Sequence, residues 1–152
     1  MLSRPLNGWT DFSLGQEVYG LSYLTNVPIE WVNQAIHGLE TLEPFAVHGV
    51  MEPDRMICLV SYWNCHIIVE DEEREILEAT DTTHEIVHVN MLDFCKMLYN
   101  DISAHVDAWS AWDWDDKVDT ETVKKQLEEK LNVLKELIVK KECYFGENRG
   151  FF

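Results

Sequence analysis

The stretch RMICLVSYW, residues 55–63, decides the class of fold. It is short and rich in β-branched and aromatic residues, which is typical of a strand. Apolar side chains fall on both of its faces, so we expect a central strand that is covered on each side. Loss of bulk at Leu59 or Val60 should therefore be costly. Helix through this stretch would contradict the whole interpretation.

Similar stretches lie on either side of residues 55–63 and predict an antiparallel sheet between about Phe45 and Val89. They are separated by turn-like residues, and the last carries enough polar residues to suit an edge of the sheet. A further short strand fits EREILEA (73–79), which gives four to five strands in all. The stretches are FAVHGVM (45–51), CHIIVED (65–71) and THEIVHV (83–89).

Helical periodicity flanks this interval on both sides. The first helix is expected from about Val27 to Thr41, with Asn26 as cap and a proline in its first turn. The second is expected from Asn90 to about Trp112, and a long amphipathic third from about Glu121 to Lys141. Residues 1–25 read as loop with one strand near residues 17–24. The sequence thus predicts one α+β domain over residues 1–152, in which the sheet packs against two to three helices.

Net charge is the strongest functional signal. The chain of 152 residues carries −16, and residues 1–116 hold 21 acidic against four basic side chains. Such a field repels phosphates and anionic lipid, so we expect no nucleic acid and no membrane partner. It attracts basic proteins. The alternative is that many cytosolic proteins are acidic only to stay soluble.

The cysteines and the N-terminal sequence indicate a reducing compartment. MLSRPLNGWTDF has neither an apolar core nor a small-residue cleavage site, so we expect a cytoplasmic protein. All four thiols should then be free and behave as buried or half-buried small hydrophobes. These residues are Cys58, Cys65, Cys95 and Cys143.

Histidines and aspartates in this chain do not form a diagnostic site. His84 and His88 would lie about 13 Å apart on a strand, too far for one zinc ion. Asp113, Asp115 and Asp119 alternate as in a calcium loop, but the glycine and the final glutamate of that loop are missing. We therefore expect no metal and no cofactor.

Tryptophans and aspartates alternate in AWSAWDWDD, residues 108–116. Trp109 shares the apolar stripe of the second helix, and Trp112 can cover the same edge. Trp114 has no stripe to join, so it is either an exposed anchor for a partner or a lid over the junction of the last two helices. Aromatic anchors ringed by acids suit the capture of a basic surface. The predicted contact residues are Asp107, Trp112, Asp113, Trp114, Asp115 and Asp116, joined by the acidic turn Glu70, Asp71, Glu72 and Glu73.

In size, acidity and expected architecture the chain resembles the immunity proteins that bacteria encode beside polymorphic secreted toxins. The resemblance covers composition and architecture across the chain but no motif. It implies a stoichiometric inhibitor that covers the active site of a basic toxin, often a nuclease, and no enzymatic activity.

Two alternatives come from other classes of protein. One is a small enzyme that uses Cys65 or one of His66, His84 and His88 in a cleft. A pocket where histidine, cysteine and carboxylate converge would favour it. The other is a homodimeric scaffold joined through the last helix, where Val133, Leu137 and Val139 lie off the main apolar stripe. Monomer and homodimer thus both remain open.

Overall fold

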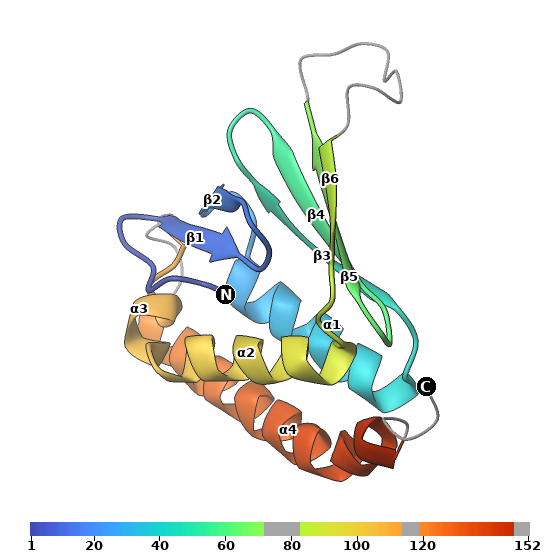
Figure 1. Ribbon diagram of the computed structural model, residues 1–152. Helices are drawn as coiled ribbons and strands as arrows, with labels where there is room; N and C mark the ends of the chain where they lie inside the picture. Colours follow the sequence, from blue (N-terminus) through green and yellow to red (C-terminus); the bar gives the residue numbers. More distant parts are fainter. Residues whose placement is uncertain (72–82, 114–118, 148–152) are drawn as a thin grey trace.

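A computed structural model describes residues 1–71, 83–113 and 119–147, and it is an α+β fold (Figure 1). Two antiparallel sheets form, one of two strands and one of four in the order β3-β4-β5-β6. None of the described helices is both long enough and apolar enough to cross a membrane. The strands are β1 (Trp9–Ser13), β2 (Val18–Ser22), β3 (Phe45–Val50), β4 (Arg55–Val60), β5 (Cys65–Glu70) and β6 (Thr83–Val87). The helices are α1 (Val27–Thr41), α2 (Met91–Ser103), α3 (Val106–Ser110) and α4 (Thr120–Glu147).

The four-stranded sheet lies in the predicted interval, with β4 at its centre and β6 at one edge. Consecutive strands pair antiparallel, and Val60 opposite Cys65 closes the hairpin between β4 and β5. Its turn is held by Ser61, whose backbone N–H donates to the carbonyl of Asn64 at 2.9 Å. The predicted meander is therefore confirmed. The further strand expected at residues 73–79 lies outside the described residues.

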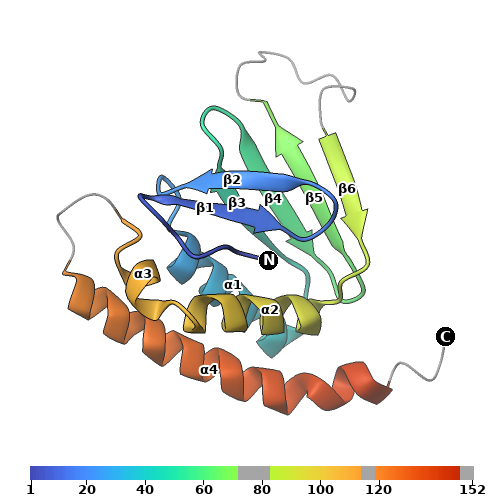
Figure 2. The same ribbon diagram turned by 60° about the vertical axis from the view of Figure 1, so that its left-hand side comes forward.

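Only one face of this sheet is covered by the described helices (Figures 1 and 2). Met56, Cys58 and Val60 of β4 are fully buried on the inner face, whereas Leu59 on the outer face is 40% exposed. The expectation that β4 is covered on both sides is thus wrong. The strand reads as apolar on both faces because much of any protein surface is apolar, so an exposed Leu59 is compatible with folding.

A layer of helices closes the inner face, and its core is continuous with the sheet. Phe45 of β3 meets Phe94 of α2 edge to face at 5.9 Å between ring centroids. Below that layer α4 runs along α1 and α2 (Figures 1 and 2). The predicted stripe of α4 supplies its buried side, namely Leu127, Leu131, Leu134 and Ile138.

The long C-terminal helix is confirmed, but it continues beyond Lys141 to Glu147. Its last turns are anchored on the turn between β4 and β5. Phe145 is buried and stacks on Tyr62 at 4.4 Å, and the Tyr62 hydroxyl donates to the carbonyl of Tyr144 at 2.9 Å. These contacts join distant parts of the sequence, so helical periodicity alone did not reveal them.

The second predicted helix is two helices in the structure. Asn90 caps α2 as expected, since its Oδ1 accepts from the Asp93 backbone N–H at 2.8 Å. The chain then leaves α-helical geometry at His105, whose φ is −138°. The His105 N–H donates to the Ile102 carbonyl, three residues back, at 3.2 Å. The apolar stripe hides this break because Ile102 and Trp109 are both buried on either side of it.

The sequence predicts only one strand of the β1–β2 hairpin. β2 lies within the predicted residues 17–24, whereas β1 lies in the part that reads as loop. The alternation in β1 is disguised, since Thr10 and not an apolar residue is buried beside Phe12. The hairpin packs on the inner face of the larger sheet at Gly49. A Cβ at Gly49 would come within 2.8 Å of the Leu21 methyl groups, so the missing side chain permits this close approach.

Candidate functional site

The predicted contact residues gather only in part, at the end of the molecule where α3 lies. Asp107 on α3 is 87% exposed, and Asp113 just beyond that helix is also exposed. Trp114, Asp115 and Asp116 lie outside the described residues.

Trp109 and Trp112 are core residues, although they stand beside aspartates in the sequence. Their rings are 5.3 Å apart between centroids, and both side chains are buried. The Trp112 Nε1–H donates to the Thr25 carbonyl at 2.8 Å. Trp112 is predicted from the sequence to contact a partner. Because its side chain is buried, it instead forms part of the lining of the site.

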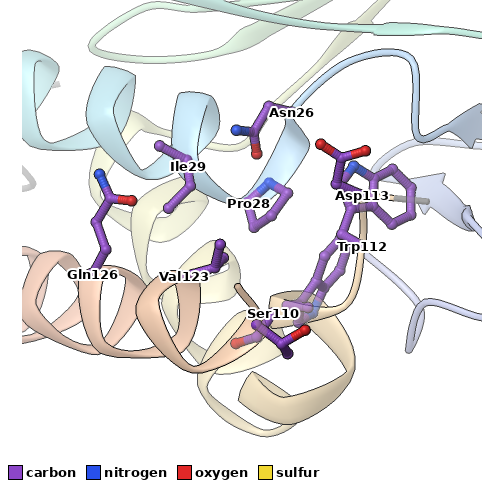
Figure 3. Close-up of a pocket in the computed structure, with 10 residues that line it drawn as sticks. Asn26, Pro28, Ile29, Ser110, Trp112, Asp113, Val123 and Gln126 are labelled. Atoms are coloured by element: carbon purple, nitrogen blue, oxygen red, sulfur yellow. The ribbon is translucent and has the colours of Figure 1, made fainter. Parts of the chain in front are cut away.

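A hollow of about 220 Å³ lies between the start of α1, the end of α3 and the start of α4 (Figure 3). Pro28, Ile29 and Val123 give it apolar walls, and Asp113 brings a carboxylate to it. Because α1 is far in sequence from α3 and α4, only the tertiary fold creates this site. Its lining is Asn26, Pro28, Ile29, Trp109, Ser110, Trp112, Asp113, Thr120, Val123 and Gln126.

One residue that lines the hollow has a buried polar atom without a hydrogen bond to any described residue. This atom is Nε1 of Trp109, which belongs to a side chain with no exposed surface. A buried N–H without a partner costs free energy, so it favours an acceptor brought by water or by a ligand. The neighbouring Ser110 hydroxyl donates to the Val106 carbonyl at 2.7 Å. The polar residues Asn26, Ser110, Asp113, Thr120 and Gln126 also line the hollow, so its wall is mixed and not purely apolar.

Further acids stand at the start of α4, and we call Asp113, Asp119 and Glu121 together the acidic end. All three are exposed. Asp119 also caps the helix, since its carboxylate accepts from the Glu121 N–H at 3.2 Å and from the Thr122 hydroxyl at 2.8 Å. The negative charge of Asp119 also interacts favourably with the positive end of the α4 dipole.

Asp107 forms an ion pair with a lysine on α4. Its carboxylate lies 2.8 Å from the Lys124 ammonium. The hydrogen bond that Lys124 donates to Asp107, and then the negative charge of Asp107, raise the pKa of Lys124. The pair is exposed and hence weak, but it reduces the field that Asp107 presents to an approaching molecule.

The end of β5, where Glu70 lies, is at a different end of the molecule from α3 (Figures 1 and 2). Glu70 closes β5 and pairs with Arg55 on the neighbouring strand. Asp71 follows it, and Glu72 and Glu73 lie outside the described residues. The structure therefore does not bring Glu70 and Asp71 together with Asp107 and Asp113.

His66 and His84 meet on the outer face of the sheet, where Nε2 of His66 is 2.8 Å from Nδ1 of His84. The spacing of His84 and His88 on one strand suggested no shared site, and the contact between His66 and His84 on two different strands was not predicted. The register between β5 and β6 was the missing signal. Cys65 points to the inner face and donates through Sγ to the Val89 carbonyl at 3.4 Å. His66 and Cys65 are thus separated by the sheet, as their adjacency on a strand predicts.

Three cysteines are buried thiols and one is not. Cys58, Cys65 and Cys95 are buried, Cys143 is exposed, and all four are free. The prediction of free thiols is confirmed, while the expected burial of Cys143 is wrong. Burial raises the pKa of the Cys95 thiol, and a hydrogen bond with Cys65 followed by burial raises that of Cys58. Such thiols stay protonated, which makes them poor nucleophiles.

The off-stripe residues of α4 are only partly free for a second chain. Val133 and Val139 are exposed, whereas Leu137 packs against the core. The apolar surface that the homodimer hypothesis requires is therefore smaller than the sequence suggests.

The chain matches no known family model, no curated protein and no solved structure with which it was compared.

Proposed function

We propose that this chain is an acidic binding protein that captures a basic protein partner at the acidic end and seats one partner side chain in the hollow beside α3. The observation that supports the proposal most directly is the hollow itself, because apolar walls and a carboxylate meet in it. The surrounding acidic residues speed the association of the partner, and the hollow stabilises the complex once it has formed.

Lysine and arginine have the chemistry that this hollow requires. Their methylene stems pack on apolar surface while their charged heads stay near water or a carboxylate. Here Pro28, Ile29 and Val123 offer the apolar surface, and Asp113 offers the carboxylate. At about 220 Å³ the hollow is smaller than the roughly 300 to 1,000 Å³ of typical small-molecule sites, so a single side chain is the better occupant.

The charge of the whole chain supports capture of a cationic surface. A net charge of −16 speeds the approach of a basic partner and orients it, chiefly through the association rate. Trp114, Asp115 and Asp116 directly follow Asp113 in the sequence. Their part in the contact stays a prediction from sequence.

Inhibition of a toxin is the role that we assign to this binding, in line with the resemblance to bacterial immunity proteins. The partner is then a basic toxin domain, with a nuclease as the leading case, because an acidic face can occupy a channel built for phosphates. The site needs no catalytic group of its own for this role. A protein that only covers an active site acts stoichiometrically.

The test uses the protein encoded by the neighbouring gene. It should inhibit growth when produced alone, and coproduction of this chain should restore growth through a complex visible by sedimentation. A neighbouring product that is harmless, or that forms no complex, would remove the immunity role.

The site is tested in the same complex by neutralising the acidic end with Asp113→Asn, Asp119→Asn and Glu121→Gln together. Association should slow and lose much of its salt dependence, since screening then has less to act on. The matched control neutralises Glu129, Glu136 and Glu142, which are also on α4 but do not line the hollow. Equal effects of the two triple variants would show that charge acts without a site.

A further inference from the structure

The outer face of the four-stranded sheet brings two imidazoles into direct contact. His66 lies on β5 opposite Ile86, and His84 lies on β6 opposite Ile68, so the two histidines are diagonal neighbours across the strands. Their ring centroids are 4.9 Å apart with an angle of 41° between the planes. No described helix covers this face (Figures 1 and 2). The pair is therefore open to ions from solution.

We propose that His66 and His84 form a bidentate binding site for a divalent transition-metal ion, with Cu²⁺ and Ni²⁺ as the best fit. Neutral imidazole nitrogen is a common ligand for these metals. One facing nitrogen must carry a proton to form the present hydrogen bond. Moving that proton to the far nitrogen of the same ring frees both facing nitrogens as ligands.

The spacing of the two nitrogens favours a particular coordination geometry. Two ligands at about 2.0 to 2.1 Å from a metal and at right angles to one another are about 2.9 Å apart, as in tetragonal Cu²⁺ or Ni²⁺ sites. A tetrahedral ion such as Zn²⁺ requires about 3.4 Å. The observed 2.8 Å between Nε2 and Nδ1 matches the first geometry. Copper and nickel should therefore bind with less movement of the rings than zinc.

The sheet holds the two histidines in register before any metal arrives. β5 is paired on both sides, by β4 and by β6, so His66 stands on a strand fixed at both edges. A second ligand that is already in place makes the second bond intramolecular, which raises affinity over a single surface histidine. The negative charge of the chain adds a general attraction for cations.

Two protein ligands leave coordination positions open. Among the described residues, no group of three or more histidine, cysteine, aspartate or glutamate side chains is placed to hold one ion. His48 is on the same face, but its register row places Ile57 and Ile68 between it and His84. The remaining positions are then filled by water or by a donor from another molecule. This inference is independent of the acidic end and of the proposed function.

Nickel titration of the whole chain tests the site, monitored by calorimetry at neutral pH in a buffer that does not chelate metals. Cys143→Ser is the background, since its exposed thiol is a competing ligand. His66→Asn and His84→Asn should each weaken Ni²⁺ binding at least about tenfold, because each leaves one imidazole. His37→Asn and His105→Asn, on α1 and between α2 and α3, are matched controls and should bind as the background does.

Histidine ring signals in NMR spectra give a second readout that does not depend on affinity. Substoichiometric Cu²⁺ should broaden the signals of His66 and His84 before those of the other histidines. Circular dichroism must show that the variants remain folded, and the ring signals of the unsubstituted chain supply the answer if one variant fails to fold. Unchanged Ni²⁺ affinity in folded His66→Asn and His84→Asn, or broadening spread equally over all histidines, would overturn the proposal.

Discussion

The indole N–H of Trp112 donates to the Thr25 carbonyl at 2.8 Å, which joins the end of α3 to the residue two positions before α1. The same carbonyl accepts from the Val27 N–H at 2.8 Å. Two segments 87 residues apart in the chain are thereby fixed to one another beneath the hollow. The geometry of the hollow thus depends on a tertiary hydrogen bond.

Trp112→Phe should lower the free energy of unfolding by about 1 to 3 kcal/mol, through the lost hydrogen bond and the lost contact area. Urea unfolding followed by circular dichroism measures this loss. Trp63→Phe is the control, because Trp63 is half exposed in the turn between β4 and β5. Equal losses in the two variants would show that Trp112 does not tie α3 to the start of α1.

The two faces of the sheet can be told apart with one residue type. Ile67 on β5 is fully buried on the inner face, and Ile86 on β6 is 62% exposed on the outer face. Ile67→Ala should cost about 2 to 5 kcal/mol, whereas Ile86→Ala should cost about 1 kcal/mol or less. Denaturant midpoints of both variants check the difference. Leu59 is also on the outer face, so Leu59→Ala should cost as little as Ile86→Ala. A large loss of stability in either variant would mean that the outer face is covered.

Strand and helix type were predictable from this sequence because they follow from the local period of apolar residues. The side of the sheet that is covered was not, because residues 55–63 are apolar on both faces and only packing distinguishes Val60 from Leu59. The break between α2 and α3 at His105 was not predictable either, because the apolar stripe through Ile102 and Trp109 continues across it.

The site was predictable only as a region of charge. Asp107 and Asp113 were identified from the sequence and lie at the α3 end, but Pro28, Ile29 and Val123 were not, because they look like ordinary helix residues. Their convergence depends on how α1 and α4 meet, which no local pattern encodes. The contact of His66 with His84 likewise required the register of two strands.

High pH should destabilise the fold through its buried thiols. The pKa of Cys95 is raised by burial, so this thiol keeps its proton in the folded state while it ionises in the unfolded chain above about pH 8.5. The unfolded state then binds fewer protons, and stability falls as pH rises from that point toward the folded pKa. The loss attributable to Cys95 approaches about 1.4 kcal/mol for each pH unit.

Urea unfolding between pH 8 and pH 10 tests this dependence in Cys95→Ala. The variant should lose stability less steeply with pH than the unsubstituted chain, whatever its stability at neutral pH. Cys143→Ala is the matched control, because the Cys143 side chain is exposed in the folded protein. An equal slope in Cys95→Ala and the unsubstituted chain would exclude this contribution.

Removal of one lysine should strengthen the steering of a basic partner. Lys124 lies 2.8 Å from Asp107 and compensates its charge beside the hollow. In Lys124→Met that carboxylate acts without its cation, so association with the basic partner should be faster and more sensitive to salt. Stopped-flow mixing at several salt concentrations measures both. Lys140→Met removes the same charge near the other end of α4 and should accelerate association less. If Lys124→Met is no faster than Lys140→Met, the partner approaches elsewhere than at the α3 end.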